Sequence, residues 1–140
     1  MPLQRYNHTL YLFVTGAVNV ANMKVLLLSD DAEFDPTDTA VNDVTNTGAW
    51  EVSGNGWDSG GEALSGVAWS VVNSADVMLD GNDLSVTATG GKIGPAAAVL
   101  LAVGTYPLFY QEFDSPEEAG IGTPFLISIN ASGIVRILEA

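Results

Sequence analysis

The chain of 140 residues has four basic and 17 acidic side chains, a net charge of −13, and no cysteine. This charge excludes nucleic acids and anionic membranes as partners, because both attract clustered Lys and Arg. The lack of cysteine excludes disulfide bonds, zinc–thiolate sites and a thiol nucleophile. Hydrophobic residues make up 47% of the chain and charged ones 15%, so we expect both a real core and neutral surface of the kind that partners cover.

The N-terminal segment, residues 1–22, is expected to form a short helix or arm. Tyr6, Leu10 and Phe13 recur at helical spacing, and Gly16 is placed to end the helix, although several neighbouring residues favour strands. The apolar runs of the chain are too short for a signal peptide or a membrane span. No linker or repeat divides the chain, so residues 1–140 are predicted to form a single domain.

A buried strand and a long acidic loop are predicted next. Residues 23–28, MKVLLL, form a continuous apolar run that suits a strand buried on both faces. Residues 29–46 are polar and acidic, and the Asp35-Pro36 pair disfavours helix there. We expect a loop with one turn of helix around residues 41–44, and loops of this length are often functional or contact a partner.

The glycine-rich corner, residues 51–64, is the feature around which the other predictions are arranged. Its sequence, EVSGNGWDSGGEAL, follows Trp50 and contains Trp57. Glycine readily adopts positive φ and lets two backbones approach closely. We therefore expect a tight corner at which an irregular N-terminal third turns into a β-sandwich; its four glycines are Gly54, Gly56, Gly60 and Gly61.

Several short strands are predicted after this corner. Residues 64–72 place Val67, Trp69 and Val71 on one face, and residues 76–79 form a second strand. Residues 80–83, Asp-Gly-Asn-Asp, then predict a reversal of the chain.

The strands that follow differ in how they alternate. Residues 84–89 alternate apolar with Ser and Thr and end at Gly90-Gly91, whereas residues 96–103 are apolar on both faces and predict a central strand. Residues 108–113 predict another strand, and residues 115–122 predict a polar loop.

The C-terminal part is expected to complete the fold. Phe125, Ile127 and Ile129 are predicted to point inward, residues 130–133 to turn the chain, and residues 134–138 to form the last strand. The whole pattern of about eight strands predicts a mostly β protein, an antiparallel β-sandwich or jelly roll with a short N-terminal helix or arm.

No pattern in the chain predicts a catalytic, cofactor or metal site. His8 is the sole histidine, no serine lies in a nucleophile elbow, and Glu117-Glu118 would need a cleft to act as an acid/base pair. Two groups of acidic residues offer oxygen ligands for calcium but lack the spacing of an EF-hand loop, so solvated loops are the preferred interpretation. These groups are Asp30, Asp31, Glu33, Asp35 and Asp38, and Asp80, Asn82 and Asp83.

The sequence resembles a family of small structural proteins of tailed bacteriophages over nearly its whole length. The resemblance lies in residues 23–46, in AWEVSGNGWDSGGEAL, and in ADVMLDGNDLSVTAT, PLFYQEFDSP and FLISINASGIVRI. Residues 47–50 are inserted relative to the usual form of the family, and residues 94–103 are unusually rich in alanine. The matching positions are Val25, Asp38, Asp43, Val44, Asn46, Glu51, Val52, Gly54, Gly56, Trp57, Gly60, Gly61 and Leu64.

The resemblance implies a virion component that decorates or cements the outer surface of the capsid, or that is attached at a tail or head fibre. A decoration protein would bind the major capsid protein and itself, possibly as a trimer, with no enzymatic activity and no cofactor. The alternative is a receptor- or glycan-binding module in which Trp57 and the loops of the glycine-rich corner stack on sugar. A glycosidase is a third and more distant hypothesis. Aromatic residues concentrate interface energy, and those expected to make contacts, with core filling as the alternative for each, are Tyr6, Phe13, Phe34, Trp50 and Trp57.

Overall fold

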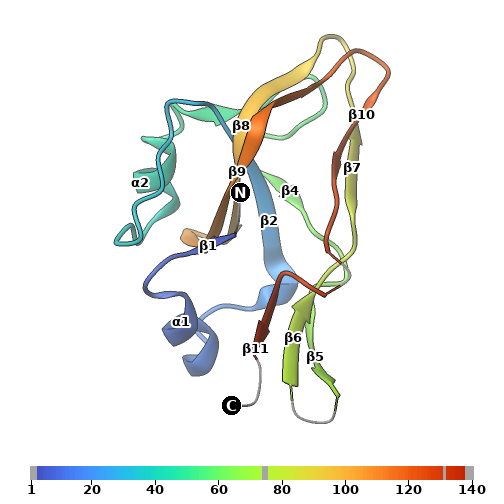
Figure 1. Cartoon of the computed structure of the whole chain (residues 1–140). Helices are drawn as coiled ribbons and strands as arrows, with labels where there is room; N and C mark the ends of the chain where they lie inside the picture. The colour runs from blue at the N-terminus through green and yellow to red at the C-terminus, as the bar shows by residue number, and fades with distance from the viewer. Residues whose placement is uncertain (1–2, 74–75, 131, 138–140) are drawn as a thin grey trace.

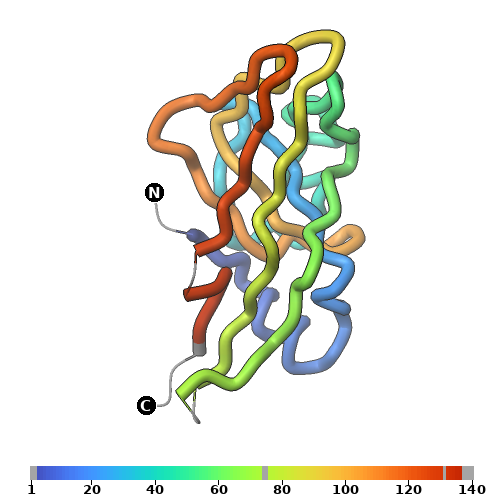
Figure 2. Tube along the Cα trace, turned by 90° about the vertical axis from the view of Figure 1, so that its right-hand side faces the viewer, coloured from blue at the N-terminus to red at the C-terminus, as the bar shows by residue number. Residues whose placement is uncertain are grey.

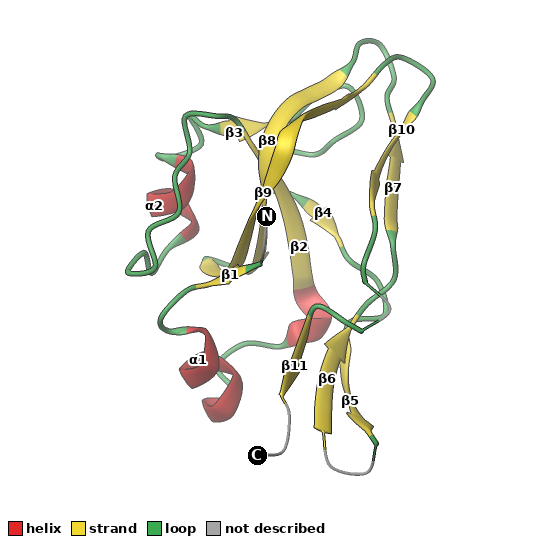
Figure 3. Ribbon diagram, viewed as in Figure 1, coloured by secondary structure: helices red, strands yellow, loops and turns green. Residues whose placement is uncertain are grey.

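The computed structural model describes residues 3–73, 76–130 and 132–137, which form a mostly β, antiparallel fold (Figures 1 and 3). Among these residues there are eleven strands where about eight were expected, and three of them, β1, β3 and β4, are only two residues long; the mostly β, antiparallel class is confirmed. The helices are α1 (Thr9–Thr15), α2 (Val41–Thr45) and a 3₁₀ turn (Val20–Asn22). The strands are β1 (Gln4–Arg5), β2 (Met23–Leu28), β3 (Glu51–Val52), β4 (Glu62–Ala63), β5 (Ala68–Val72), β6 (Asp76–Asp80), β7 (Leu84–Thr87), β8 (Ile93–Val103), β9 (Tyr106–Ala119), β10 (Pro124–Ile127) and β11 (Val135–Ile137).

The strands form one main sheet and a second layer. The main sheet has six strands in the order β1-β9-β8-β2-β3, with β4 also paired to β2. Two smaller sheets, β11-β6-β5 and β10-β7, make up the second layer. Figures 1 and 2 show this second layer running along one face of the main sheet, while α2 lies on the opposite face. The fold is therefore sandwich-like, with a helix added outside the main sheet.

The central strands β2 and β8 are buried on both faces at residues 25–28 and 98–103, as their apolar runs predict, whereas Lys24 of β2 is exposed. Alternate residues such as Leu27 and Leu101 point into an inner cluster, which includes side chains of the second layer. Their neighbours Leu26 and Leu100 point into an outer cluster, which includes Val44 of α2. Because side chains alternate along a strand, only a strand covered on both sides needs apolar residues at every position.

Helix α1 ends as predicted but buries a different face from the one expected. Gly16 adopts the left-handed conformation, with φ of 71°, and its N–H bonds to the carbonyl of Phe13. The predicted stripe is wrong, because Tyr6 lies before the helix and Leu10 is 37% exposed. Thr9 fixes the buried face instead, since its hydroxyl donates to the carbonyl of Leu108 at 2.8 Å inside the protein.

The acidic loop contains the short helix expected around residues 41–44. The carboxylate of Asp43 accepts a hydrogen bond from the N–H of Ala40 at 3.1 Å, which satisfies a donor at the start of α2. Val44 is buried against the outer face of the main sheet. The loop therefore covers part of the outer face of the main sheet, opposite the second layer.

The glycine-rich corner joins the two layers. A Cβ added to Gly61 would lie 2.8 Å from the carbonyl oxygen of Val25 in β2, and one added to Gly56 would lie 2.8 Å from that of Thr87 in β7. Between them Trp57 is 1% exposed and packs edge-on against Phe125 of β10. The corner thus lies directly against the main sheet and the second layer.

The predicted reversal at residues 80–83 is wrong. Strands β6 and β7 do not pair with each other; the chain runs on from one small sheet into the other (Figure 2). The turn-forming side chains are used for bonds to other segments instead. The side-chain amide of Asn82 donates to the hydroxyl of Ser65 at 3.1 Å, and the carboxylate of Asp83 accepts from the N–H of Ile129 at 2.7 Å.

Two further predictions need correction. Residues 115–119 were expected in a polar loop but continue β9, where Glu117 pairs with Ala96 and Ala119 with Ile93 of β8. Val71 was placed on one face with Val67 and Trp69, but burial differs along that face: Val67 is buried, whereas Val71 is 71% exposed. The end of the last predicted strand, at residue 138, lies outside the described residues, as does residue 131 of the predicted turn.

Candidate functional site

The five aromatic residues expected to make contacts do not form one surface. Tyr6 and Trp57 are 0% and 1% exposed, so core filling describes both of them. Phe13 is partly buried and meets Trp69 with ring centroids 5.3 Å apart. Phe34 and Trp50 are partly buried against the outer cluster, on the opposite side of the main sheet from Trp57. Three of the five therefore keep some surface for a partner.

Tyr6 and Tyr110 form a buried aromatic group with Phe34, whose ring centroid lies 5.0 Å from that of Tyr6 and 5.6 Å from that of Tyr110. Burial, reinforced by the carboxylate of Asp38, raises the pKa of Tyr6 far above its usual range. Burial together with nearby carboxylates, first that of Glu112, raises the pKa of Tyr110 to about 12. Both hydroxyls therefore stay protonated in the folded chain at neutral pH.

Alkaline pH is expected to destabilise the fold through these tyrosines. An unfolded tyrosine ionises near pH 10, so above that pH the unfolded state releases protons that the folded state retains, and the free energy of unfolding falls as pH rises. Tyr6→Phe should make the melting temperature less sensitive to pH between about 10 and about 12. The exposed Tyr11 is the matched control, because Tyr11→Phe should leave that dependence as in the parent chain. An equal pH dependence in Tyr6→Phe and the parent chain would contradict the assignment.

Two of the titratable side chains considered in the sequence analysis, His8 and Glu118, make structural contacts. Nε2 of His8 donates to the carbonyl of Pro107 at 2.6 Å, which joins the start of α1 to the start of β9. Glu117 and Glu118 are neighbours on β9, so they point to opposite faces of the strand, and Glu118 pairs with Lys92 at 2.8 Å. Within residues 3–73, 76–130 and 132–137, no group of three or more His, Asp or Glu side chains is placed to hold a metal ion.

The acidic residues of loop 29–46 lie close enough to affect one another. Asp38 has its pKa raised by partial burial and then by the carboxylates of Asp35 and Asp43. Asp35 has its pKa lowered by hydrogen bonds from the hydroxyl and the backbone N–H of Thr37. This loop gives the side of the molecule around α2 a strongly negative character.

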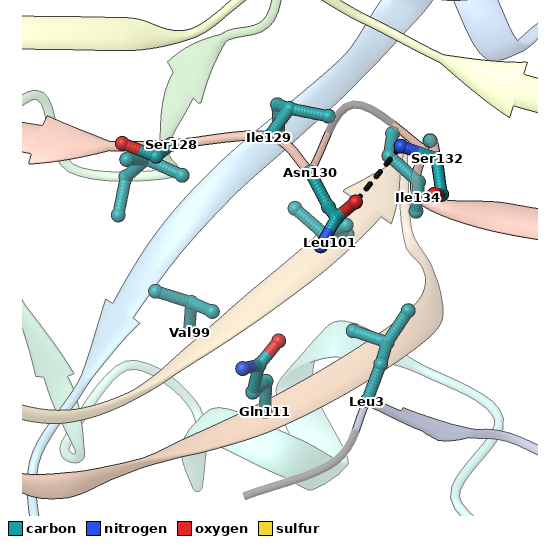
Figure 4. Close-up of a pocket in the computed structure, with 11 residues that line it drawn as sticks. Leu3, Val99, Leu101, Gln111, Ser128, Ile129, Asn130, Ser132 and Ile134 are labelled. Carbon is teal, nitrogen blue, oxygen red and sulfur yellow. Dashed lines mark hydrogen bonds between the residues drawn. The ribbon is translucent and has the colours of Figure 1, made fainter.

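A hollow of about 640 Å³ opens between the main sheet and the C-terminal segment (Figure 4). Its floor includes Val99 and Leu101 of β8, and its rim includes Gln111, Asn130 and Ser132. The side chain of Asn130 accepts from the N–H of Ser132 at 2.8 Å and is thereby used in the turn. The described residues that line the hollow are apolar or uncharged.

The most distinctive surface lies on α1. Leu10, Tyr11 and Val14 are 37%, 70% and 86% exposed and share the side of the helix away from Leu12. Tyr106, 40% exposed, lies beside the start of the helix, where its ring meets that of His8. We call these four residues, Leu10, Tyr11, Val14 and Tyr106, the α1 face.

The α1 face lies in an uncharged part of an acidic chain. Residues 6–23 contain no Asp, Glu, Lys or Arg, although the chain as a whole carries a net charge of −13. A surface without charge, rich in large apolar side chains, is typical of a protein contact. No helix among the described residues is long and apolar enough to cross a membrane.

The prediction from sequence missed the α1 face because it assigned the wrong stripe of the helix to the core. Once Leu12 and Phe13 are taken as buried, Leu10, Tyr11 and Val14 fall on the opposite side at the 3.6-residue period. A helix that is apolar on both sides, in a stretch free of charge, is the signal that would have identified it.

Comparisons of the chain with models of known protein families, with curated proteins and with solved structures each found no match.

Proposed function

We propose that the chain is a capsid decoration protein of a tailed bacteriophage, which binds the major capsid protein and itself on the outer surface of the head. The resemblance of its sequence to small phage structural proteins motivates the proposal. The observation that carries it is the α1 face, an exposed apolar surface without charge on a molecule of net charge −13.

The division of charge supports this proposal on physical grounds. An exposed apolar side chain gains free energy when a partner removes it from water, and a nearby carboxylate would oppose that burial. Carboxylates are missing from residues 6–23 and frequent in loop 29–46. The loop borders the segment just before α1, where the N–H of Asn7 donates to the carbonyl of Pro36 at 2.9 Å. In the proposed arrangement the α1 face therefore meets the capsid, and the acidic loop lies at the edge of that contact, toward solvent.

The alternative is a receptor- or glycan-binding module of a tail or head fibre, in which Trp57 and the loops of the glycine-rich corner stack on sugar. It loses its aromatic residue. A sugar stacks on an exposed aromatic ring, but the Trp57 side chain is enclosed between the two layers. Decoration is therefore the function we favour.

The number of copies in the virion tests the proposal. Quantitative mass spectrometry of purified particles should give on the order of hundreds of copies, as closed icosahedral symmetry requires of a decoration protein. A handful of copies would support the fibre alternative, and absence from the particle would contradict both.

A charge placed on the α1 face should weaken attachment without unfolding the chain. Val14 is 86% exposed, so we expect Val14→Glu to change the free energy of unfolding by less than about 0.5 kcal/mol. Binding to heads prepared without the chain, measured by co-sedimentation, should weaken by about tenfold or more, because the carboxylate loses its water.

Ser85→Glu is the matched control for this experiment. It adds the same charge at an exposed position of β7, away from α1, and should bind heads like the parent chain. Equal binding by Val14→Glu and Ser85→Glu would show that the α1 face is not the contact.

A further inference from the structure

Most strand edges in the described part of the chain carry features that prevent pairing with another strand. On one side of the main sheet, β3 and β4 are two residues long and contain Glu51 and Glu62. On the other side, β1 pairs only with Phe109 and Tyr110 of β9. Short strands, charge and proline all discourage edge-to-edge association. The rest of β9 carries Glu112, Asp114, Pro116, Glu117 and Glu118.

The edges of the second layer are protected in similar ways, with one exception. Strand β10 begins at Pro124 and borders a hollow that Glu117 and Glu118 also line. The end of β7 lies against the glycine-rich corner, since Gly56 packs on the carbonyl of Thr87. Strand β11 is three residues long and contains Arg136.

The exception is β5. Its sequence, AWSVV, contains no charge, no proline and no glycine, and it pairs with β6 in an unbroken register from Ala68–Asp80 to Val72–Asp76. It is the outermost strand of its sheet, and Figure 2 shows it at the side of the second layer away from the C-terminal strand. Val71 on this strand is 71% exposed. A regular, uncharged edge of this kind is a template for one more strand.

We infer that a second copy of this chain supplies that strand, with the two β5 strands antiparallel and Ser70 facing Ser70 on a two-fold axis. In this register Trp69 of each copy lies opposite Val71 of the other, on the same face of the joined sheet. Ala68 lies opposite Val72 on the other face. Each pair thus combines a smaller with a larger side chain, and the pattern is complementary to itself.

Packing within one copy prepares this contact. The Trp69 side chain is half-buried, and its ring meets that of Phe13 at 5.3 Å and 84°, which fixes the indole before any partner arrives. Its remaining surface is available to cover the exposed Val71 of the other copy. An aromatic ring opposite a β-branched residue is a favourable cross-strand pair.

Charge favours this edge for self-association and also limits its strength. Two molecules of net charge −13 repel each other, so they associate most readily where neither presents a carboxylate. Near β5, Asp76 of β6 is paired with Arg136 at 3.2 Å. Because salt screens the remaining repulsion and the contact is apolar, the dimer should become tighter as ionic strength rises, the opposite of an interface held by ion pairs.

This inference rests on the self-association included in the proposed function, but its test uses the isolated chain. Sedimentation velocity in about 50 mM and about 500 mM NaCl should show a dimer that strengthens with salt. A monomer under both conditions would overturn the β5 pairing, whereas the copy number in the virion would still decide the function.

Cysteine cross-linking tests the register. The natural chain has no cysteine, so Ser70→Cys places a single thiol at the two-fold axis, where antiparallel partners have Cα atoms about 4.5–5.5 Å apart, within the range of a disulfide. Mild oxidation should give a covalent dimer much faster than in Ser85→Cys, which carries an exposed thiol on β7. Equal rates in the two variants would overturn the predicted register.

Charge substitution tests the edge itself. Val71→Lys should raise the dimer dissociation constant by at least about tenfold, because it replaces an apolar side chain of the contact with a charge and brings two ammonium groups close together across the two-fold axis. Leu126→Lys, at a 57% exposed position of β10, is the matched control and should leave the dimer intact. Both variants lower the net negative charge equally, so general repulsion cannot explain a difference between them. An unchanged dimer in Val71→Lys would overturn the inference.

Discussion

Replacing Trp57 with alanine is expected to lower the free energy of unfolding by about 3–5 kcal/mol, a large part of the stability of a domain of this size. The indole is 1% exposed and lies in the inner cluster, with its ring centroid 5.5 Å from that of Phe125. Its removal leaves a cavity between the layers that the glycine-rich corner cannot fill, because close approach already fixes Gly56 and Gly61. Chemical denaturation followed by circular dichroism measures the loss.

Two variants separate core filling from a contact role for this residue. Trp57→Phe keeps most of the buried apolar surface and should lose much less stability than Trp57→Ala. Trp50→Ala, at a partly buried position against the outer cluster, should also lose less. If Trp57→Ala kept its unfolding midpoint but failed to associate, the residue would be a contact after all.

The strands that could be predicted are those in which burial alone determines which positions are apolar. Residues 84–89 alternate because one side of β7 faces the inner cluster, and that alternation is visible in the sequence alone. The runs 25–28 in β2 and 96–103 in β8 are apolar because the sheet is covered on both faces there. In both cases burial determines composition, and composition can be read from the chain.

The predictions that were wrong concern residues that are compatible with two kinds of local structure. Asn82 and Asp83 have side chains that favour turns, but hydrogen bonds to Ser65 and Ile129 use them to hold an extended segment instead. Polar residues at 115–119 indicate a loop, yet an edge strand needs charge and proline for its own protection. Distant partners decide between the two uses, and the local sequence does not contain them.

The sequence indicated that the chain has apolar contact surface, but it did not indicate which residues form that surface. The shortage of charge indicated contact surface, and the aromatic residues were taken as its location. Tyr6 and Trp57 proved too deeply buried, while Tyr11 and Val14 on α1 and Val71 on β5 are the exposed apolar residues. Aromatic side chains fill cores as readily as interfaces, so residue type alone does not distinguish the two.

Replacing Gly61 with alanine is expected to destabilise the chain by about 1–3 kcal/mol more than replacing its neighbour Gly60. Both residues have positive φ, 101° and 87°, so alanine is strained at either position by about 1–2 kcal/mol. They differ in space: a Cβ at Gly60 meets nothing within 4 Å, whereas one at Gly61 would lie 2.8 Å from the carbonyl oxygen of Val25. Equilibrium unfolding of the two variants measures the difference directly.

A second matched pair, Gly56→Ala and Gly54→Ala, tests whether close backbone contact also matters on the side of the second layer. A Cβ at Gly56 would lie 2.8 Å from the carbonyl oxygen of Thr87, and one at Gly54 would lie in open space, although φ is positive at both. Equal losses in all four variants would mean that backbone conformation alone requires these glycines. A larger loss at Gly56 and Gly61 would instead mean that close backbone contact holds the corner to both layers. Because one of these contacts reaches the main sheet and the other the second layer, either substitution would then weaken the packing around Trp57.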